Sequence, residues 1–268
     1  MAEDKLDVPA GLWNRCSSCG HMVYEKEVSE ALGVCPECGH HRRIDARTRI
    51  AQLVDTDSFE EFAKDLRSTD PLNFTDRIPY RDRLVKEREK TGEQEAVVVG
   101  LGYIRGRRVA LAVMNPYFIM ASMGAVVGEK ITRVIEKAIE EDIPLIVVTA
   151  SGGARMQEGM VSLVQMAKTS AALAQLDDVK GLYIVVATDP TTAGVAASFA
   201  SLGDVILSEP KAMIGFAGPR VIANTINAEL PEGFQTAEFM QEHGFVDRIV
   251  PRDGLRSEIA RVIDYCGK

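Results

Sequence analysis

Short apolar runs alternate with segments of helical periodicity along most of this chain. The runs 144–150 and 182–187 consist mainly of Leu, Ile, Val and Ala. Uninterrupted apolar runs of this length are typical of strands that are buried on both faces. Segment 125–141 instead carries apolar residues three and four positions apart, which predicts a helix with one buried side.

The other predicted elements complete an alternation of strands and helices. Two runs, 96–103 and 108–114, flank Arg105-Gly106 and predict a hairpin. Further helices are predicted at 44–54, 79–91, 156–168, 195–200, 219–228, 236–240 and 253–265, and short strands at 204–208, 212–216 and 246–250. Strand pairs that alternate with helices predict an α/β fold of repeated β-β-α units.

Two of the predicted strand–helix junctions are rich in small residues. Ser151-Gly152-Gly153-Ala154 follows one buried strand, and Ala193-Gly194 lies between the other strand and its helix. N–H groups at a helix start have no intrahelical partner, and glycine lets a ligand approach the backbone. The two junctions therefore predict backbone donors aimed at one cleft, as in an oxyanion hole. On spacing alone, ordinary tight turns of an α/β protein are an equally good explanation.

Four of the five cysteines form two Cys-x-x-Cys pairs, Cys16/Cys19 and Cys35/Cys38, with 15 residues between the pairs. This is the spacing of a zinc ribbon, in which each pair gives two thiolates to one tetrahedral ion. Two disulfides are the alternative, which a cytoplasmic chain disfavours. Four cysteine ligands leave no open coordination position, so the pattern predicts one structural zinc ion.

Length and charge limit the remaining choices. At 268 residues the chain has room for one large α/β domain and a small appendage. We expect a disordered start at 1–12, the ribbon at 13–43 and the large domain at 44–268. The net charge of −8 argues against a general nucleic-acid binder. A charged start and the lack of long apolar runs predict a cytoplasmic protein without a signal peptide or membrane span.

The large domain offers few side chains for catalysis. Its only histidine is His243, within Glu242-His243-Gly244, where a helix C-terminal cap is expected, and its only cysteine is Cys266. It contains neither the Gly-x-Ser-x-Gly elbow of esterases nor a Walker loop. If the chain is an enzyme, its chemistry is therefore expected to use backbone N–H groups and a substrate or cofactor that brings its own base.

Several long strings, in order along the chain, are specific to one family. They are Leu12-Trp13 before the cysteines, Met123-Gly124 ahead of Val127-Gly128-Glu129-Lys130, Ser151 through Gly159, Met166-Ala167-Lys168-Thr169-Ser170, and Ile214 through Ile222. With them the chain resembles, over essentially its whole length, the β subunits of bacterial acetyl-coenzyme A carboxylase carboxyltransferases.

The resemblance implies a fold, a reaction and partners. The fold is crotonase-like (ClpP/crotonase), with a small N-terminal four-cysteine zinc ribbon. The reaction moves a carboxyl group from carboxybiotin, held on a biotin carboxyl carrier protein, to acetyl-CoA, and gives malonyl-CoA for fatty-acid synthesis. The partners are an α subunit of the same fold, in an α2β2 heterotetramer, and biotin carboxylase in the larger complex. The basic ureido anion of biotin would take the substrate proton, which fits the shortage of protein bases.

The resemblance also implies the site residues. Gly152-Gly153 and Ala193-Gly194 would supply the oxyanion donors, and Met123, Gly124 and Arg155 would lie at the substrate. Two roles are open for Arg155, a phosphate contact and a structural ion pair; a cation at a helix start opposes the helix dipole and favours the ion pair. Relatives often have Gly-Gly where this chain has Ala193-Gly194, and the alanine keeps its N–H while its methyl group narrows the approach.

Two features leave alternatives open. Some relatives have glycines at Met120-Ala121, so a close backbone contact at that turn is in question. The arginines 42, 43, 47 and 49 form a basic cluster that would be solvated, meet the CoA phosphates, or contact RNA. The competing functions are accordingly a zinc-ribbon nucleic-acid-binding regulator and a carboxyltransferase for another acyl-CoA, such as propionyl-CoA.

Overall fold

The computed structural model describes residues 11–218, 222, 225 and 230–268. The chain divides into two compact units, Met1–Arg43 and Ile44–Lys268. The predicted helix at 219–228 falls almost entirely outside the described residues. Among the residues that the structure describes, no helix is long and apolar enough to cross a membrane.

The first unit is small and is built around its cysteines. Strand β1 (Trp13–Arg15) pairs antiparallel with β2 (Met22–Tyr24), and helix α1 (Glu25–Glu30) follows. Its buried core consists of Cys16, Val23, Val28 and Cys35. With only two valines besides the cysteines, this core is too small to hold the unit together without a metal or disulfides.

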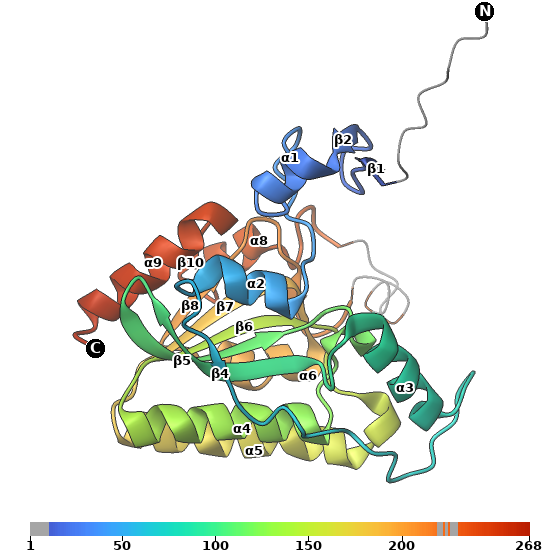
Figure 1. Ribbon diagram of the computed structural model, residues 1–268, viewed down its shortest axis with the longest axis vertical. Coiled ribbons are helices and arrows are strands. Elements are labelled where there is room, and N and C mark those ends of the chain that lie inside the picture. Colours follow the sequence, from blue (N-terminus) through green and yellow to red (C-terminus); the bar gives the residue numbers. More distant parts are fainter. Residues whose placement is uncertain (1–10, 219–221, 223–224, 226–229) are drawn as a thin grey trace, which may run out of the picture. The chain divides into compact units, whose positions relative to one another are not determined.

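The second unit contains a mixed sheet with the strand order β10-β8-β7-β6-β5-β4-β3, and β9 pairs with β7 beyond that path (Figure 1). The strands are β3 (Glu60–Glu61), β4 (Val97–Ile104), β5 (Arg107–Met114), β6 (Leu145–Ser151), β7 (Tyr183–Thr192), β8 (Val205–Ser208), β9 (Ile214–Gly215) and β10 (Arg248–Ile249). Strands β3, β4 and β5 pair antiparallel, and the pairs from β5 to β10 are parallel.

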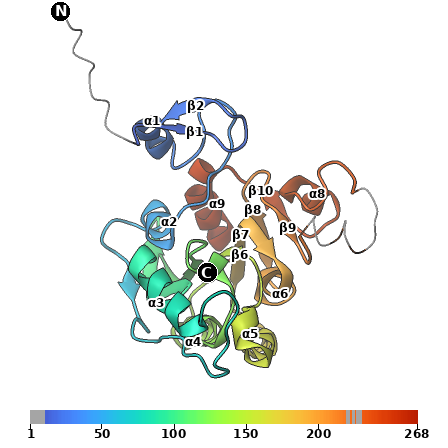
Figure 2. The same ribbon diagram turned by 90° about the vertical axis from the view of Figure 1, so that its right-hand side faces the viewer.

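Helices cover both faces of this sheet (Figures 1 and 2). On one face lie α4 (Ala125–Glu141) and α5 (Met160–Asp178), and on the other α2 (Ala46–Leu53) and α9 (Arg252–Tyr265). Successive residues of β6 enter different cores: Leu145 and Val147 pack with the α4 side, and Ile146 and Val148 with the α2 and α9 side. A strand covered on both faces needs apolar residues at every position, which is why its sequence does not alternate.

Most predicted elements are present, and the pairing of the strands explains where two of them differ. Helix α3 (Tyr80–Thr91) ends where predicted, at Gly92, whose φ of 71° is left-handed. The strand predicted at 182–187 is longer: β7 runs on to Thr192 because Thr191 and Thr192 pair with β9. The helix predicted at 195–200 is accordingly split into α6 (Ala193–Ala196) and a 3-10 turn, η3 (Phe199–Ser201).

Candidate functional site

The four cysteines of the first unit converge on one point. One sulfur atom from each of Cys16, Cys19, Cys35 and Cys38 lies within 4.8 Å of the others. Each pair closes an equivalent turn: the Gly20 N–H donates to the Cys16 carbonyl and the Gly39 N–H to the Cys35 carbonyl, at 3.0 and 2.9 Å. A backbone hydrogen bond from Cys19 lowers the pKa of the Cys16 thiol, whereas burial and the neighbouring cysteine sulfurs raise the pKa of the Cys19 thiol. Four soft ligands at this spacing fit tetrahedral zinc, and zinc in such a site is structural.

The two glycine-containing junctions lie side by side in the second unit. Strands β6 and β7 are parallel neighbours with Ser151 opposite Thr191. The loops that follow the two strands therefore leave the sheet at the same end. A Cβ atom placed on Gly153 would lie 2.5 Å from Ala193 Cβ and 3.4 Å from Gly194 N. The two junctions are therefore neighbours in space, and only glycine fits at position 153, where φ is 111°.

Two of the four expected N–H donors already have partners. The Gly152 N–H donates to the Met120 carbonyl at 2.9 Å, and the Gly153 N–H donates to Ser151 Oγ at 3.0 Å. These bonds fix the loop, and they leave neither N–H free for a ligand in this conformation.

Two N–H groups at the same place are available, that of Gly194, which was expected from the sequence, and that of Ala154, which was not. Within the described part of the chain, neither the Ala154 N–H nor the Gly194 N–H has a hydrogen-bond partner. The two residues touch: a Cβ atom on Gly194 would lie 3.2 Å from Ala154 Cβ and 3.4 Å from Ala154 N. Gly194 is in the first turn of α6, where N–H groups lack intrahelical acceptors. The sequence does not predict Ala154 as a donor, because nothing in the residues around it marks its N–H as free. Only the hydrogen bonds of the loop distinguish Ala154 from the two glycines before it.

The loop rests on a left-handed turn. Three successive non-glycine residues, Ile119, Met120 and Ala121, have φ values of 45°, 52° and 48°. The Met120 carbonyl accepts the Gly152 N–H, and the Ala121 carbonyl accepts the Ser151 hydroxyl at 2.7 Å. The sequence left open whether Met120 and Ala121 can make a close backbone contact without glycine. The structure shows that they do. Left-handed conformations cost about 1–2 kcal/mol for each such residue, and such strain clusters at functional sites.

Arg155 is fully buried directly behind this loop. Its guanidinium donates to Glu95 Oε1 at 2.5 Å and to the Ser122 carbonyl at 2.7 Å. The Arg155 guanidinium also donates hydrogen bonds to Ser122 Oγ, Tyr80 Oη and Ser68 Oγ. Of the two roles open for Arg155, the structure shows the ion pair, and its exposed fraction of 0% leaves no surface for a substrate phosphate.

A second carboxylate connects Arg155 to helix α4. Glu158 Oε1 accepts the Tyr80 hydroxyl at 2.6 Å, and Glu158 Oε2 accepts the Ala125 N–H, at the start of α4, at 2.6 Å. A Cβ atom on Gly124 would lie 2.5 Å from the Glu158 carboxylate, so only glycine leaves room for this bond. Met123 is buried, and its N–H donates to the Gly153 carbonyl at 2.8 Å. Met123 and Gly124, expected at the substrate, thus support the loop from behind.

Burial and neighbouring charges shift the pKa values of Glu95 and Tyr80 in this cluster. Burial alone would raise the pKa of Glu95, but the Arg155 guanidinium and the Ser68 hydroxyl hold it below the ordinary value. Burial raises the pKa of Tyr80, which therefore remains a neutral donor to Glu158. The Glu158 side chain accepts the Ala125 N–H at the start of α4, which is the positive end of the helix dipole.

The arginines of the basic cluster have structural partners. Arg47 donates to Glu93 at 2.6 and 2.8 Å and to Glu61 at 2.6 Å. Arg49 is buried, with its guanidinium 2.7 Å from Glu209. These two cations are held by carboxylates and do not form an open basic surface.

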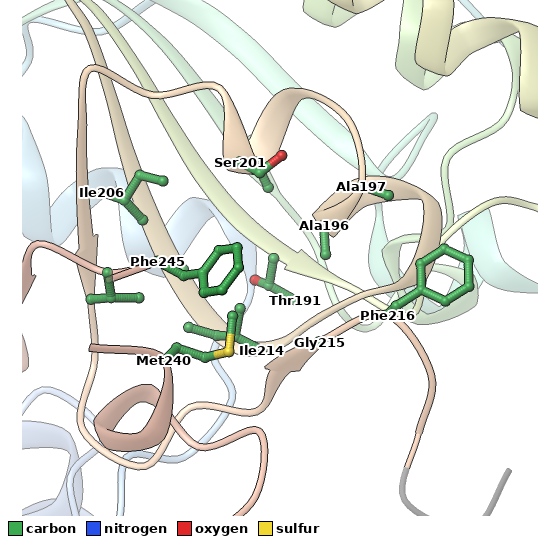
Figure 3. Close-up of a pocket in the computed structure, with 13 residues that line it drawn as sticks. Thr191, Ala196, Ala197, Ser201, Ile206, Ile214, Gly215, Phe216, Met240 and Phe245 are labelled. Carbon is green, nitrogen blue, oxygen red and sulfur yellow. The ribbon is translucent and has the colours of Figure 1, made fainter. Parts of the chain in front are cut away.

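Two further features involve helix α8 and the elements packed against it. His243 follows α8 (Ala237–Glu242) as its C-cap, and its ring stacks on Phe239 at 4.0 Å. An apolar pocket of about 360 Å³ lies between α6, β9 and α8. Figure 3 shows Phe216 at one end of it, beside Ala197, and Phe245 with Met240 at the other.

Two protein-family models match this chain, one for each of its two units. A family model described as "Carboxyl transferase domain" matches residues 43–265, and one described as "Acetyl-CoA carboxylase zinc finger domain" matches residues 13–38. Among solved structures, transcarboxylase 12S superposes with a TM-score of 0.71 at 24% identity, over 90% of this chain and 43% of that one. The Pseudomonas malonate decarboxylase MdcD-MdcE hetero-dimer superposes with a TM-score of 0.63 at 23% identity, over 83% of this chain and 86% of that one. Fold and sequence together define a carboxyl transferase with a crotonase-like fold.

Curated relatives narrow the family. The acetyl-coenzyme A carboxylase carboxyl transferase subunit beta of Rhodopirellula baltica is 57% identical over 98% of this chain and 85% of its own length. The corresponding subunit of Carboxydothermus hydrogenoformans is 54% identical over 97% of this chain and 91% of its own length. A Clostridium tetani protein named "subunits beta/alpha" is 52% identical over 97% of this chain but only 45% of its own length. This chain belongs to the family of acetyl-coenzyme A carboxylase carboxyl transferase β subunits.

The zinc site gives a first prediction. Replacing Cys19 by Ser removes one of four ligands, so the ribbon is expected to lose its zinc and its fold, because the core of this unit is too small to persist without the metal. Zinc measured by mass spectrometry should fall from one ion per chain to well below one. The control Cys266→Ser removes an exposed cysteine of the other unit and should keep the zinc. Full zinc retention by the Cys19→Ser variant would contradict the four-cysteine site.

The Arg155 ion pair gives a second prediction. Glu95→Gln leaves a buried guanidinium without its main counter-charge and is expected to lower the free energy of unfolding by about 3–5 kcal/mol, measured by urea denaturation at pH 7. The control Glu60→Gln, at an exposed position, should change it by less than about 0.5 kcal/mol.

The same carboxylate sets a pH dependence. Since the pKa of Glu95 is lower in the folded protein, its contribution is fully present above the unfolded pKa of about 4.3 and is lost as the pH falls through the folded value. The unmodified protein should therefore lose stability below about pH 4 more steeply than the Glu95→Gln variant. Parallel pH profiles for the two proteins would argue against this pair.

Proposed function

We propose that this chain is the β half of a carboxyltransferase that moves a carboxyl group from carboxybiotin to acetyl-CoA and so forms malonyl-CoA, the first committed step of fatty-acid synthesis. The observation that carries the proposal is the pair of unpartnered N–H groups of Ala154 and Gly194, in a chain whose large domain has no histidine or cysteine at the loop. The family membership supports the choice of substrate.

Oxyanion stabilisation is the step that these residues perform. Acetyl-CoA must lose a methyl proton, and the negative charge of the resulting enolate collects on the thioester oxygen. N–H groups that already point to that position stabilise the charge without reorganising, and removing one such donor typically costs about 3–4 kcal/mol of barrier. We assign this role to Ala154 and Gly194. Of the four donors expected from the sequence, Gly152, Gly153, Ala193 and Gly194, this assignment keeps Gly194 and adds Ala154.

The proton and the carboxyl group are supplied and received by the substrates. When the N–CO2 bond of carboxybiotin breaks, CO2 and a ureido anion form, and the anion takes the methyl proton of acetyl-CoA. The enolate carbon then forms a bond to CO2 and becomes malonyl-CoA. The chain need contribute no side-chain base, which agrees with the placement of His243 as the C-cap of α8, where its ring stacks on Phe239.

Arg155 and its buried partners would act by holding the Ala154 N–H in place. Arg155 directly follows Ala154, and its backbone N–H donates to the Met123 carbonyl at 2.9 Å while its side chain is held by Glu95. Ala154 therefore has little freedom to turn its N–H away. Preorganised donors of this kind lose much of their effect when the geometry shifts by about 1 Å.

The partners follow from the same proposal. One chain provides one oxyanion site, and we propose that an α subunit of similar fold completes the cleft, in an α2β2 assembly supplied by a biotin carboxyl carrier protein and biotin carboxylase. The Clostridium tetani relative, in which a beta and an alpha portion share one chain, supports this pairing. A nucleic-acid-binding role gains no support from Arg47 and Arg49, because carboxylates neutralise both.

The direct test is carboxyl transfer in reverse. Carboxyl-labelled malonyl-CoA and a soluble biotin derivative are incubated with this chain, with an α subunit, and with both. Label is expected on biotin only in the mixture, because one chain supplies half of the cleft. Absence of transfer by a folded, zinc-loaded mixture would reject the carboxyltransferase proposal, and repeating the assay with methylmalonyl-CoA separates acetyl-CoA from propionyl-CoA specificity.

The donor assignment gives a further prediction. In Gly194→Ala the new methyl group would lie 3.4 Å from Ala154 N, in the space that the oxyanion needs. We expect kcat to fall about 100-fold with KM for malonyl-CoA changed less than threefold, because the loss is felt mainly in the transition state. The matched control Gly102→Ala places its methyl group in ordinary contact, 3.4 Å from Val54, and should keep full activity. An unchanged kcat in Gly194→Ala would remove Gly194 from the mechanism.

A further inference from the structure

A methionine of helix α5 lies directly beside the two N–H donors. A Cβ atom placed on Gly194 would lie 3.3 Å from Met166 Sδ, as well as 3.2 Å from Ala154 Cβ and 3.4 Å from Ala154 N. The thioether of Met166 therefore borders the space between the Ala154 and Gly194 N–H groups, which we assign to the enolate oxygen. Donating N–H groups to that oxygen does not require this side chain, so its presence there calls for another explanation.

The surroundings of Met166 hold it in this place. Ser162 lies one turn before Met166 on the same side of α5, and its hydroxyl donates to the Arg155 carbonyl at 2.5 Å. Helices α5 and α6 are in contact, and Figure 2 shows them side by side. Met166 is half-buried and packs against the core on the α4 side of the sheet. Because side chains packed on a core occupy few rotamers, the thioether forms a wall of defined position.

The reacting carbon of the substrate must lie close to this wall. In an enolate a single carbon atom separates C2 from the oxygen, so an oxygen bound by the two N–H groups brings C2 to the space that Met166 and the Ala154 methyl group border. C2 of acetyl-CoA carries only hydrogen atoms, whereas C2 of propionyl-CoA carries a methyl group. A packed wall has no room for that methyl group unless its own atoms move.

We infer that Met166 restricts the acyl group to two carbons, because its thioether occupies the position that the additional carbon of propionyl-CoA would take. This inference rests on the proposed function and names the residue that selects its substrate. One additional methylene in an apolar pocket changes specificity by about 10–200-fold. With the α subunit, the unmodified chain should therefore have a kcat/KM for malonyl-CoA about 10–200-fold higher than for methylmalonyl-CoA.

The test shortens this methionine and measures the transfer of label to biotin in the presence of the α subunit. Met166→Ala removes the thioether and is expected to reduce the ratio of kcat/KM for malonyl-CoA to that for methylmalonyl-CoA by about 10-fold or more. Met166→Leu, which has a similar volume, should keep the ratio within about threefold of its original value. The ratio is measured because a chain that is merely destabilised loses rate with both substrates alike.

The matched control is Met240→Ala. Met240 is another half-buried methionine, and it lies on α8, where it packs against a separate apolar cluster. The control shortens the same type of side chain and should leave the ratio unchanged.

Two results would overturn the inference. One is an unchanged ratio in Met166→Ala, and the other is an equal loss of kcat/KM for both substrates in that variant. The proposed function is judged separately, by whether the unmodified chain with the α subunit transfers label from malonyl-CoA at all. Calorimetric titration with acetyl-CoA and propionyl-CoA tests the wall without turnover. Met166→Ala should bring the two Kd values about 10-fold closer together, and an unchanged Kd ratio would count against Met166 even where no transfer is seen.

Discussion

The buried guanidinium of Arg155 is the constraint on which the site depends. A cation with no exposed surface must have its donors satisfied, and here Glu95, Ser122, Tyr80 and Ser68 provide the acceptors. These partners come from segments far apart in the sequence, so one side chain fixes the start of β4, the loop before α3 and the turn before α4 against the loop after β6. Whatever the loop binds, its backbone is held by this cluster.

The hydrogen bonds of the loop then decide which backbone groups can meet a ligand. Carbonyl groups of the left-handed turn at Ile119–Ala121 accept hydrogen bonds from the Gly152 N–H and the Ser151 hydroxyl. The Ser151 hydroxyl oxygen in turn accepts the Gly153 N–H. The glycines thus serve close packing and unusual backbone angles, and the donors come from the next residue and from α6. An alanine can fill that role because a donor needs only its N–H, provided that no larger side chain blocks the approach.

Much of the architecture was readable from the sequence because it depends on local patterns. The runs at β6 and β7, the periodicity of α4 and the Cys-x-x-Cys pairs each carry their own signal, and the junctions after β6 and β7 were correctly marked as neighbours. The choice of Ala154 over Gly152 was not readable, since it depends on Met120 and Ser151 lying close in space. The burial of Arg155 was equally hidden, because its partner Glu95 is 60 positions away in the sequence. The end of β7 was missed for the same reason: Thr191 and Thr192 are strand residues only because β9 returns to pair with them.

The central claim is that the enolate oxygen lies between the N–H groups of Ala154 and Gly194. A crystal structure of this chain with the α subunit and a stable enolate mimic of acetyl-CoA tests it most directly. The account predicts the mimic's oxygen at about 2.7–3.1 Å from both Ala154 N and Gly194 N, with the Gly152 and Gly153 N–H groups still bonded to Met120 and Ser151. An oxygen bound instead by Gly152 or Gly153, with Ala154 turned away, would contradict it.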